Sequence, residues 1–401
     1  MSSNLLVFLS HIFKMSKYFL LILLFLLKLE DRIAAEDTEN TNMDILTSLG
    51  DIAKSIDTSQ EVLKRPYIPL SEVPKSELSR EDIKKYIYTT REKDLQLNIV
   101  EDLTNNLSGL DLSDLDFRNS IMSNVIMVGC DISGSSFSGA MLEGADMRNI
   151  KGISTKFNDA DISGSNLEDA NLQYTNFSGV FANNSNFTRA KLDNMIAVNA
   201  SFQESIFTEA TLNNVQMQKS QFQNSNFNKT EAKNAKFRSS TLANSKINDS
   251  DWSYVDMTSS VSIGSEFNNT ILSHAKMSSG NFSHAKFFKT MMNDIYAEGI
   301  DFSNCQFIES DLSGSILANS SFQNSDIIDS QMCRCVMNDI DMHNANLSGT
   351  NLESSLMKNI LLASTKFDGT KLINVFLETQ QMDSIDISKA VIENSVISTL
   401  Q

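Results

Sequence analysis

The sequence predicts an all-β solenoid over most of the chain, on the strength of two observations. From Leu112 to Ile397 a large apolar residue returns at every fifth position without a slip of the frame, in 52 of 58 pentads. Two positions before it stands a second column, in which 48 of 58 residues are Ala, Ser, Thr, Cys, Gly or Val. A short period kept over so long a stretch is typical of a solenoid and not of an ordinary globular domain.

A period of five excludes a regular helix or a half-buried strand, because helices repeat every 3.6 residues and strands alternate. A coil with one short flat side and one corner per pentad fits it. The large residue and the small residue two positions before it then both point inward, as alternate residues of an extended segment do. The other three positions are rich in Asn, Asp, Ser, Gly, Gln and Lys, which suits solvent-facing sides and tight corners.

The pentads read ADISG SNLED ANLQY TNFSG at residues 160–179 and SDLSG SILAN SSFQN SDIID at residues 310–329. This pattern resembles the pentapeptide-repeat family, whose motif centres on Leu or Phe with a small residue two positions earlier. The resemblance covers roughly residues 107–399. It implies a right-handed quadrilateral β-helix with four pentads per coil, hence 20 residues per turn and about 14 coils in this chain.

Columns of residues twenty apart agree with that coil. One outward column alternates in sign and is expected to form a charge ladder of Asp169, Arg189, Glu209, Lys229 and Asp249. Inward, we expect two phenylalanine stacks as the structural core, Phe117, Phe137, Phe157 and Phe177 in one and Phe187, Phe207, Phe227, Phe267, Phe287 and Phe307 in the other. Trp252 is expected to fill the space that the small Ser262 leaves on the opposite face.

Residues 1–35 are predicted to be a signal peptide or a signal anchor. Lys14 and Lys17 precede an uncharged run at residues 18–27, and Ala35 offers a cleavage point. This run is shorter than the roughly 20 residues of a membrane span and fits the core of a signal peptide better. The alternative is an uncleaved anchor through residues 5–29, which would contact a membrane. We therefore expect a secreted or membrane-anchored protein, with a cytoplasmic location less favoured.

The region between this leader and the repeats is predicted to be a linker followed by a cap. Residues 36–75 are a polar linker that holds all 3 prolines. Residues 76–106 are predicted to be a helical cap, in which Ser79 and Asp82 have the spacing of a capping box. Two apolar stripes follow at helical spacing: Ile83, Tyr86 and Ile87, then Leu95, Ile99 and Leu103. A cap is needed because a terminal coil exposes its core and its unpaired backbone.

The β-helix is assigned to residues 107–401. Near its C-terminal end stand Val391, Ile392, Val396 and Ile397, with no helical pattern after them to cover the last coil. Because an uncovered sheet edge pairs readily with another chain, and closed two-fold pairing is the commonest arrangement, we expect an end-to-end homodimer.

Charge and chemistry argue against nucleic acid and against catalysis. Residues 110–188 carry a net charge of −6, residues 189–289 of +3 and residues 290–401 of −10, whereas a nucleic-acid-binding protein needs a basic face. His343 has only Asp339 and Asp341 near it in the sequence, at other positions of their pentads. Cys130, Cys305 and Cys335 fall in the inward column and only Cys333 points outward. We expect no catalytic residue, no metal and no cofactor, and therefore no enzyme.

Two function classes remain. The first is a non-enzymatic rod, exported or tethered to a membrane, that acts as a protein–protein interaction surface, for example as a secreted effector; the sequence does not identify the partner. The alternative is the branch of the resembled family that mimics duplex DNA and binds DNA gyrase. The leader, the long region before the repeats and the basic-leaning middle favour the first class.

Overall fold

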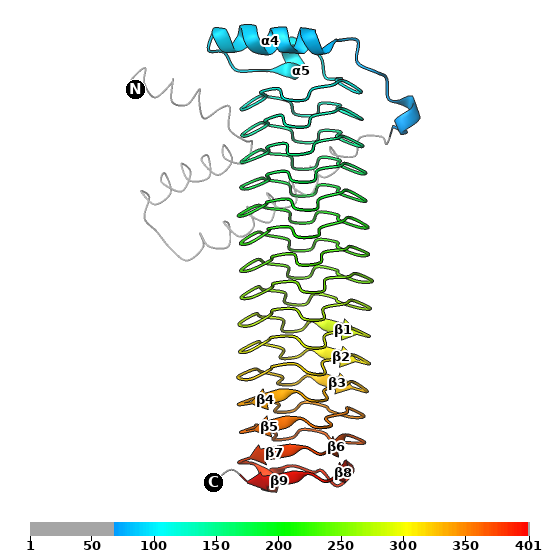
Figure 1. Ribbon diagram of the computed structural model, residues 1–401, viewed down its shortest axis with the longest axis vertical. Helices are drawn as coiled ribbons and strands as arrows, with labels where there is room; N and C mark the ends of the chain where they lie inside the picture. Colours follow the sequence, from blue (N-terminus) through cyan, green and yellow to red (C-terminus); the bar gives the residue numbers. More distant parts are fainter. Residues whose placement is uncertain (1–67, 400–401) are drawn as a thin grey trace, which may run out of the picture. The chain divides into compact units, whose positions relative to one another are not determined.

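The computed structural model describes residues 68–399, so the predicted leader and most of the predicted linker lie outside the described part. The chain divides into two units, Met1–Tyr67 and Ile68–Gln401. The second unit is a parallel β-solenoid with a few short helices (Figure 1). The all-β solenoid predicted from the pentads is confirmed.

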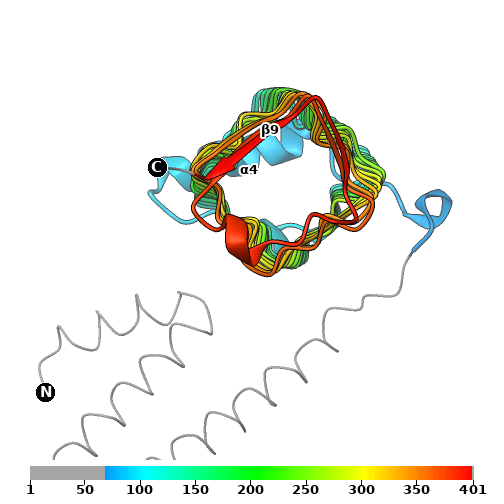
Figure 2. The same ribbon diagram turned by 90° about the horizontal axis from the view of Figure 1, so that it is seen from below.

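Successive coils pair through parallel bridges between residues twenty positions apart, from Asn106 with Ile126 to Lys366 with Asp386. The amide of Leu112 donates to the carbonyl of Asp131 at 2.7 Å, and the amide of Asp131 donates back to Leu110 at 3.1 Å. Seen along the axis, the coils superpose as a ring (Figure 2). Because every coil repeats the same bonds, each 20 residues lengthen the rod by one strand spacing, about 4.8 Å.

Each pentad ends in a corner whose residue has a positive φ. In one coil these residues are Asp114, Asn119, Asn124 and Gly129, with φ of 55°, 54°, 64° and 67°. The amide of Ser120 donates to the carbonyl of Phe117 at 3.2 Å and closes the turn around Asn119. Gly, Asn and Asp tolerate this left-handed region best, which explains their abundance at the corners.

The flat sides lengthen into strands only after residue 285, where they form three parallel sheets. In the first sheet β1 (Lys286–Phe288), β2 (Gln306–Ile308) and β3 (Asp326–Ile328) lie side by side. The second sheet contains β4 (Val336–Asn338), β5 (Leu356–Lys358), β7 (Phe376–Thr379) and β9 (Val396–Thr399). In the third, β6 (Lys371–Ile373) pairs with β8 (Val391–Glu393). A 3-10 helix, η3 (Met382–Ser384), interrupts the last coils.

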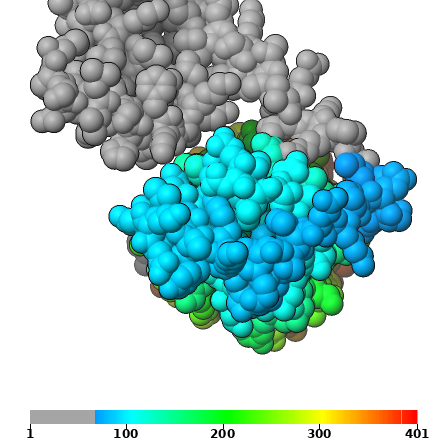
Figure 3. Space-filling model, turned by 90° about the horizontal axis from the view of Figure 1, so that it is seen from above, coloured from blue at the N-terminus to red at the C-terminus, as the bar shows by residue number. Residues whose placement is uncertain are grey.

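Two helices, α4 (Arg80–Glu92) and α5 (Ile99–Asp102), lie across the first coil at the top of the rod (Figure 1). Seen from above, residues of this N-terminal segment cover that end (Figure 3). A short 3-10 helix, η2 (Leu70–Glu72), lies beside the rod and has no buried residue. Ser79 caps α4 in a capping box with Asp82, and Ile83 and Ile87 are buried in the same core cluster as the coils. Arg80 fixes the helix to the second unit's first coil by donating to the carbonyl of Ser113 at 2.7 Å.

The second predicted stripe of the cap is only partly correct. Ile99 is buried, but Leu95 is 58% exposed and lies outside any helix. The chain leaves α4 through Asp94, whose φ of 53° is incompatible with a continuing helix. Asn98 then starts the single turn of α5 by accepting from the amide of Glu101 at 3.2 Å. Helical spacing in the sequence therefore overstated the length of this second helix.

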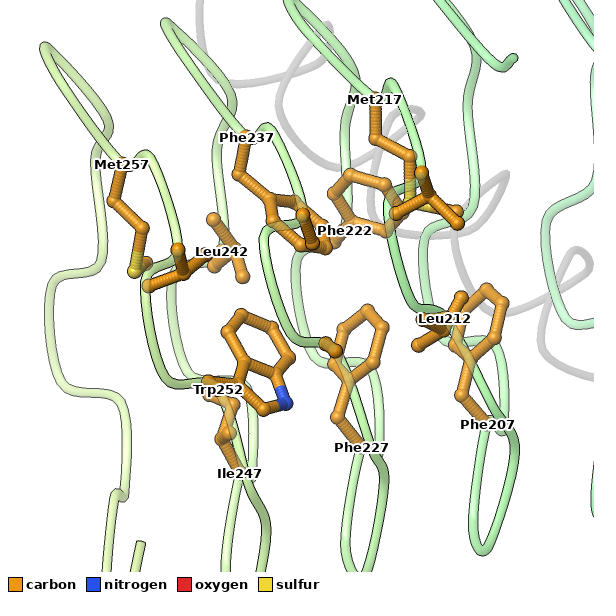
Figure 4. Close-up of a cluster of buried hydrophobic side chains, with 14 of the residues drawn as sticks. Phe207, Leu212, Met217, Phe222, Phe227, Phe237, Leu242, Ile247, Trp252 and Met257 are labelled. Atoms are coloured by element: carbon orange, nitrogen blue, oxygen red, sulfur yellow. The ribbon is translucent and has the colours of Figure 1, made fainter. Parts of the chain in front are cut away.

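The phenylalanines named from the sequence are fully buried and lie in stacks along the axis. Phe117 and Phe137 have ring centroids 4.8 Å apart, and Phe207 and Phe227 have theirs 4.7 Å apart. A further stack, Phe202 on Phe222 at 5.3 Å, packs edge-on against the second series (Figure 4). This stack could also have been predicted from the sequence, because Phe202 and Phe222 are twenty residues apart.

Trp252 is also fully buried. Its ring stacks on Phe237 with centroids 4.9 Å apart and meets Phe227 edge-on at 5.3 Å. Both rings belong to the preceding coil (Figure 4), so the indole has partners that the sequence analysis did not name.

Many residues of the small inward column are Ser, Thr or Cys, and most of their buried side chains form hydrogen bonds. Ser135 donates from its hydroxyl to the carbonyl of Leu112 at 2.6 Å and accepts from the amide of Leu115 at 3.0 Å. Cys130 donates from its thiol to the carbonyl of Leu107 at 2.9 Å, and burial raises the pKa of this thiol to about 12. Buried polar groups need such partners, so Ser, Thr and Cys serve here as small core residues that also join neighbouring coils.

Candidate interaction surface

The outward positions of the pentads form straight columns along the rod, because the coil repeats after twenty residues. Amide side chains bond along these columns. Asn344 donates to Asn324 at 3.1 Å, and Asn359 donates to Asp339 at 2.7 Å. Carboxylates at the start of a pentad also accept from the amide two residues on, as Asp131 does from Ser133 at 3.0 Å. Much of the polar surface is therefore bonded within the rod.

The predicted charge ladder is a set of separate pairs. Arg189 lies 2.8 Å from Asp169 and 2.5 Å from Glu168, and these bonds lower the pKa of Asp169. Further along, Lys229 is 3.7 Å from Glu209, while Asp249 accepts from the amide group of Asn269 at 3.0 Å. Within residues 68–399, no ion pair joins Arg189 to Glu209 or Lys229 to Asp249. Each side chain of this column thus pairs with one neighbour in the column and not with both.

Within residues 68–399, the histidines and carboxylates do not gather into a metal-binding cluster. His343 is less isolated than the sequence indicated, since its Nδ1 lies 2.6 Å from Asp341 and its Nε2 lies 3.2 Å from the amide of Gln381. Burial raises the pKa of Asp341, but bonds from His343 and Gln323 outweigh it and hold that pKa below its usual value. In the described part of the chain, no three His, Cys, Asp or Glu side chains are placed to hold a metal ion.

Two shallow depressions lie at corners of the rod. One, of about 420 Å³, is lined by residues that include Asp301, Asp339 and Asp341. The other has the same volume and is lined by residues that include Lys229 and Asp251. Both depressions lie between a left-handed corner and the next flat side of the coil, with lining residues from successive coils.

One outward column stands out because it is apolar over six consecutive coils. We call it the apolar ladder, and it consists of Tyr296, Ile316, Val336, Leu356, Phe376 and Val396. Parallel bridges join each member to the next. Val336 is half-buried, and the other five are between 38% and 56% exposed. The last four begin β4, β5, β7 and β9, which lie one below the other in Figure 1.

The same column is polar in the earlier coils. From the first repeat onward it holds Asp116, Ser136, Lys156, Asn176, Ile196, Gln216, Lys236, Asp256 and Lys276. Only Ile196 is large and apolar, and it stands alone. The ladder therefore does not follow from the pentad pattern, which leaves this position free to be polar. Large apolar side chains that stay exposed in one contiguous patch mark an interaction surface.

Reasoning from the sequence missed this surface. The sequence analysis considered the inward columns, the charged outward columns and, at the C-terminal end, only Val391, Ile392, Val396 and Ile397 as part of the last coil's edge. The sequence does contain the signal. Once the coil length is known, six apolar residues at intervals of twenty can be recognised as one outward column.

The family is decided by the repeats themselves. A family model of pentapeptide repeats matches the chain in 8 copies, over residues 111–149, 130–169, 153–189, 185–224, 300–339 and 340–378. The chain belongs to the pentapeptide-repeat family. Solenoids of this family are generally non-enzymatic structural or interaction proteins.

Several solved structures resemble this pentapeptide-repeat protein. A trypsin-treated variant of QnrB1, a plasmid-mediated fluoroquinolone resistance protein, is 19% identical, with 42% of this chain and 82% of that chain covered and a TM-score of 0.26. A pentapeptide repeat protein from the Arabidopsis thaliana thylakoid lumen is 27% identical, with 28% and 68% covered and a TM-score of 0.20. HetL from Nostoc sp. strain PCC 7120, involved in heterocyst differentiation regulation, is 14% identical, with 74% and 98% covered and a TM-score of 0.20. No curated protein matches the chain.

Proposed function

We propose that this pentapeptide-repeat protein is a non-enzymatic rod, exported or membrane-tethered, that binds a protein partner through the apolar ladder. The observation that carries the proposal is the contiguous exposure of large apolar side chains in one column over six coils, from Tyr296 to Val396. Regular backbone on both sides holds them at fixed positions, so binding needs little ordering of the surface. Preorganised surfaces of this kind lose less free energy on association.

A non-enzymatic role agrees with how the polar groups are arranged. Several carboxylates of the outward columns are bonded along the rod, as Asp131 is to the amide of Ser133, Asp169 to Arg189 and Asp339 to Asn359. The buried thiols of Cys130 and Cys335 have pKa values raised to about 12 by burial, so they are protonated at neutral pH and poor nucleophiles. Hydrolytic or transfer chemistry would need an activated nucleophile beside a base.

A gyrase-binding DNA mimic is less well supported. Such a surface needs closely spaced negative charge. In the C-terminal third, one whole outward column is the apolar ladder and carries no charge. The middle third, residues 189–289, carries a net charge of +3. We therefore give protein binding through the ladder priority over mimicry of duplex DNA.

Export rests on residues 1–35, which lie outside the described part of the chain. Within residues 68–399 no helix is long and apolar enough to cross a bilayer. Mass spectrometry of the native protein tests the proposal. We expect a mature N-terminus near Glu36, or the intact chain in the membrane fraction. A soluble cytosolic protein that retains its leader would overturn the export part of the proposal.

The binding part is tested by photo-cross-linking in the native cell. A photoreactive phenylalanine at Leu356 should capture a protein, whereas the same residue at Gln216, seven coils earlier in the same outward column, should not. Equal capture at the two positions, or none at either, would contradict a role for the ladder in binding.

A further inference from the structure

The spacing of the apolar ladder restricts what can cover it. Its six members lie one coil apart, and with a strand spacing of about 4.8 Å the five intervals span roughly 24 Å. A helix laid along the rod repeats about every 5.4 Å and slips by roughly 3 Å over that length. An extended strand returns to the same face only about every 6.7 Å. A second solenoid with the same rise keeps register with all six positions.

We propose that the apolar ladder pairs with the ladder of a second copy of this chain, running antiparallel, about a two-fold axis midway between Val336 and Leu356. This inference rests on the proposed function, because it takes the ladder to be the interaction surface. The axis places Tyr296 opposite Val396 of the second copy, Ile316 opposite Phe376, and Val336 opposite Leu356. Each pair sets a β-branched side chain against a larger one, so bulky residues do not meet bulky residues.

The neighbouring outward column supports this register. Two residues after each ladder position stand Glu298, Ala318, Asn338, Lys358, Glu378 and Ser398. The same two-fold axis sets this column against itself in reverse order. Glu298 then faces Ser398, Ala318 faces Glu378, and Asn338 faces Lys358. Every charged residue meets an uncharged one, whereas like charges directly opposite one another are destabilising.

A parallel arrangement of the two copies is less favourable. It sets each ladder residue against its own counterpart, so that Tyr296 meets Tyr296 and Phe376 meets Phe376 while Val396 meets Val396. The two surfaces would then touch at the aromatic residues and leave gaps at the valines. Side chains that face a gap lose van der Waals attraction.

The predicted contact is small. A face about 24 Å long and roughly 10 Å wide is well below the ~800 Å² per partner of a standard interface. We therefore expect a dimer whose population depends on protein concentration. The overlap involves only the C-terminal coils, so the two N-terminal caps point away from each other and the rest of each rod remains open to other partners.

Cysteine cross-linking of the full chain tests the register directly. All variants carry Cys333→Ser, which removes the outward thiol. A chain with Ala318→Cys, mixed with a chain with Glu378→Cys and treated with a short bismaleimide, should form a cross-linked heterodimer, because facing sheets lie about 10 Å apart. Either variant alone should form little product, because two identical thiols would lie three coils apart along the rod, about 14 Å, in addition to the distance across the interface.

Matched controls separate the outcomes. Leu356→Asp in both chains should reduce the cross-linked product at least tenfold, and Gln216→Asp, in the same outward column, should leave it unchanged. Circular dichroism checks that all variants keep the fold. Cross-linking of Ala318→Cys with itself as efficient as that of the mixed pair would contradict the proposed register and overturn the proposal. So would a chain that stays monomeric in sedimentation at high concentration, or one that pairs end to end and forms no cross-link between positions 318 and 378.

The two proposals fail in different ways. If Leu356 captures another protein in the native cell while the purified chain remains monomeric, the ladder is an interaction surface but not a self-association surface. If it captures nothing and the chain is monomeric, both proposals are wrong.

Discussion

The indole nitrogen of Trp252 donates a hydrogen bond to the hydroxyl of Thr230 across 2.9 Å, inside the core of the rod. Thr230 lies one coil earlier and donates in turn to the carbonyl of Phe227 at 2.8 Å. A buried tryptophan usually finds such a partner for its N–H. Here the partner is supplied by the small inward column, in which residues such as Ser135 and Thr175 bond to backbone groups.

Thr230→Val should therefore lower the free energy of unfolding by more than the same substitution at another threonine of this column. Leaving the buried indole N–H without a partner costs about 1–3 kcal/mol in the free energy of unfolding. Thr175 is the matched control, because its hydroxyl also donates to a carbonyl, that of Leu172 at 2.6 Å, but receives no indole. Urea unfolding measures both variants. In a Trp252→Phe background the two substitutions should cost the same, and a persisting difference would show that the indole is not its cause.

The aromatic stacks give a second prediction. Phe207→Ala removes a ring that stacks on Phe187 at 5.0 Å and on Phe227 at 4.7 Å, so it should lower the free energy of unfolding by about 3–5 kcal/mol. Gln203→Ala changes an outward residue in the same coil and should cost less than about 0.5 kcal/mol. Comparable losses for the two variants would mean that the inward and outward columns are misassigned.

The strict frame explains why so much of the core was predictable. Once every fifth residue is inward and the coil is 20 residues long, the neighbours of Phe207 follow by arithmetic, because the backbone bonds of all coils are alike. The same rule placed Asp169 beside Arg189. Few proteins allow contacts to be read so directly from intervals in the sequence.

Other features depend on side-chain rotamers, which no interval encodes. Trp252 contacts Phe237 and Thr230 of the preceding coil, and these contacts were not predictable from its column. Arg189 bonds to Asp169 and not to Glu209, although both lie one coil away. The apolar ladder was hidden for a different reason, since the pentad pattern constrains inward positions and gives no rule for an outward residue such as Leu356.

The pair of Asp169 and Arg189 predicts a pH dependence. The bonds from Arg189 lower the pKa of Asp169 in the folded protein. A lowered acid pKa contributes stability above the unfolded value, about 3.9 for Asp, and this contribution is lost as the pH falls through the folded value. Since both side chains are partly exposed, at 44% for Arg189 and 35% for Asp169, the coupling should be only about 0.2–1 kcal/mol.

A double-mutant cycle with Asp169→Asn and Arg189→Met measures this coupling. It should be constant from pH 7 to about pH 4 and disappear at lower pH. The same cycle between Asp169 and Lys229, three coils apart, should give no coupling at any pH. A coupling between Asp169 and Arg189 that grows as the pH falls below 4 would contradict the assignment of the pair.

Two corner glycines provide a last prediction, because they share a backbone conformation but differ in their surroundings. Gly129 and Gly134 have φ of 67° and 72°. A Cβ at Gly129 would meet nothing within 4 Å, whereas a Cβ at Gly134 would lie 2.2 Å from the carboxylate of Asp114, one coil earlier. Gly129→Ala should therefore cost only the left-handed backbone penalty of about 1–2 kcal/mol. Gly134→Ala should cost more, because the carboxylate of Asp114 has to move.

An Asp114→Gly background is the control. There the additional loss in the free energy of unfolding at Gly134 should vanish, and the two alanine substitutions should be equal in thermal and urea unfolding. An excess at Gly134 that survives this change would place the strain in the backbone of the corner itself and not in the contact between neighbouring coils.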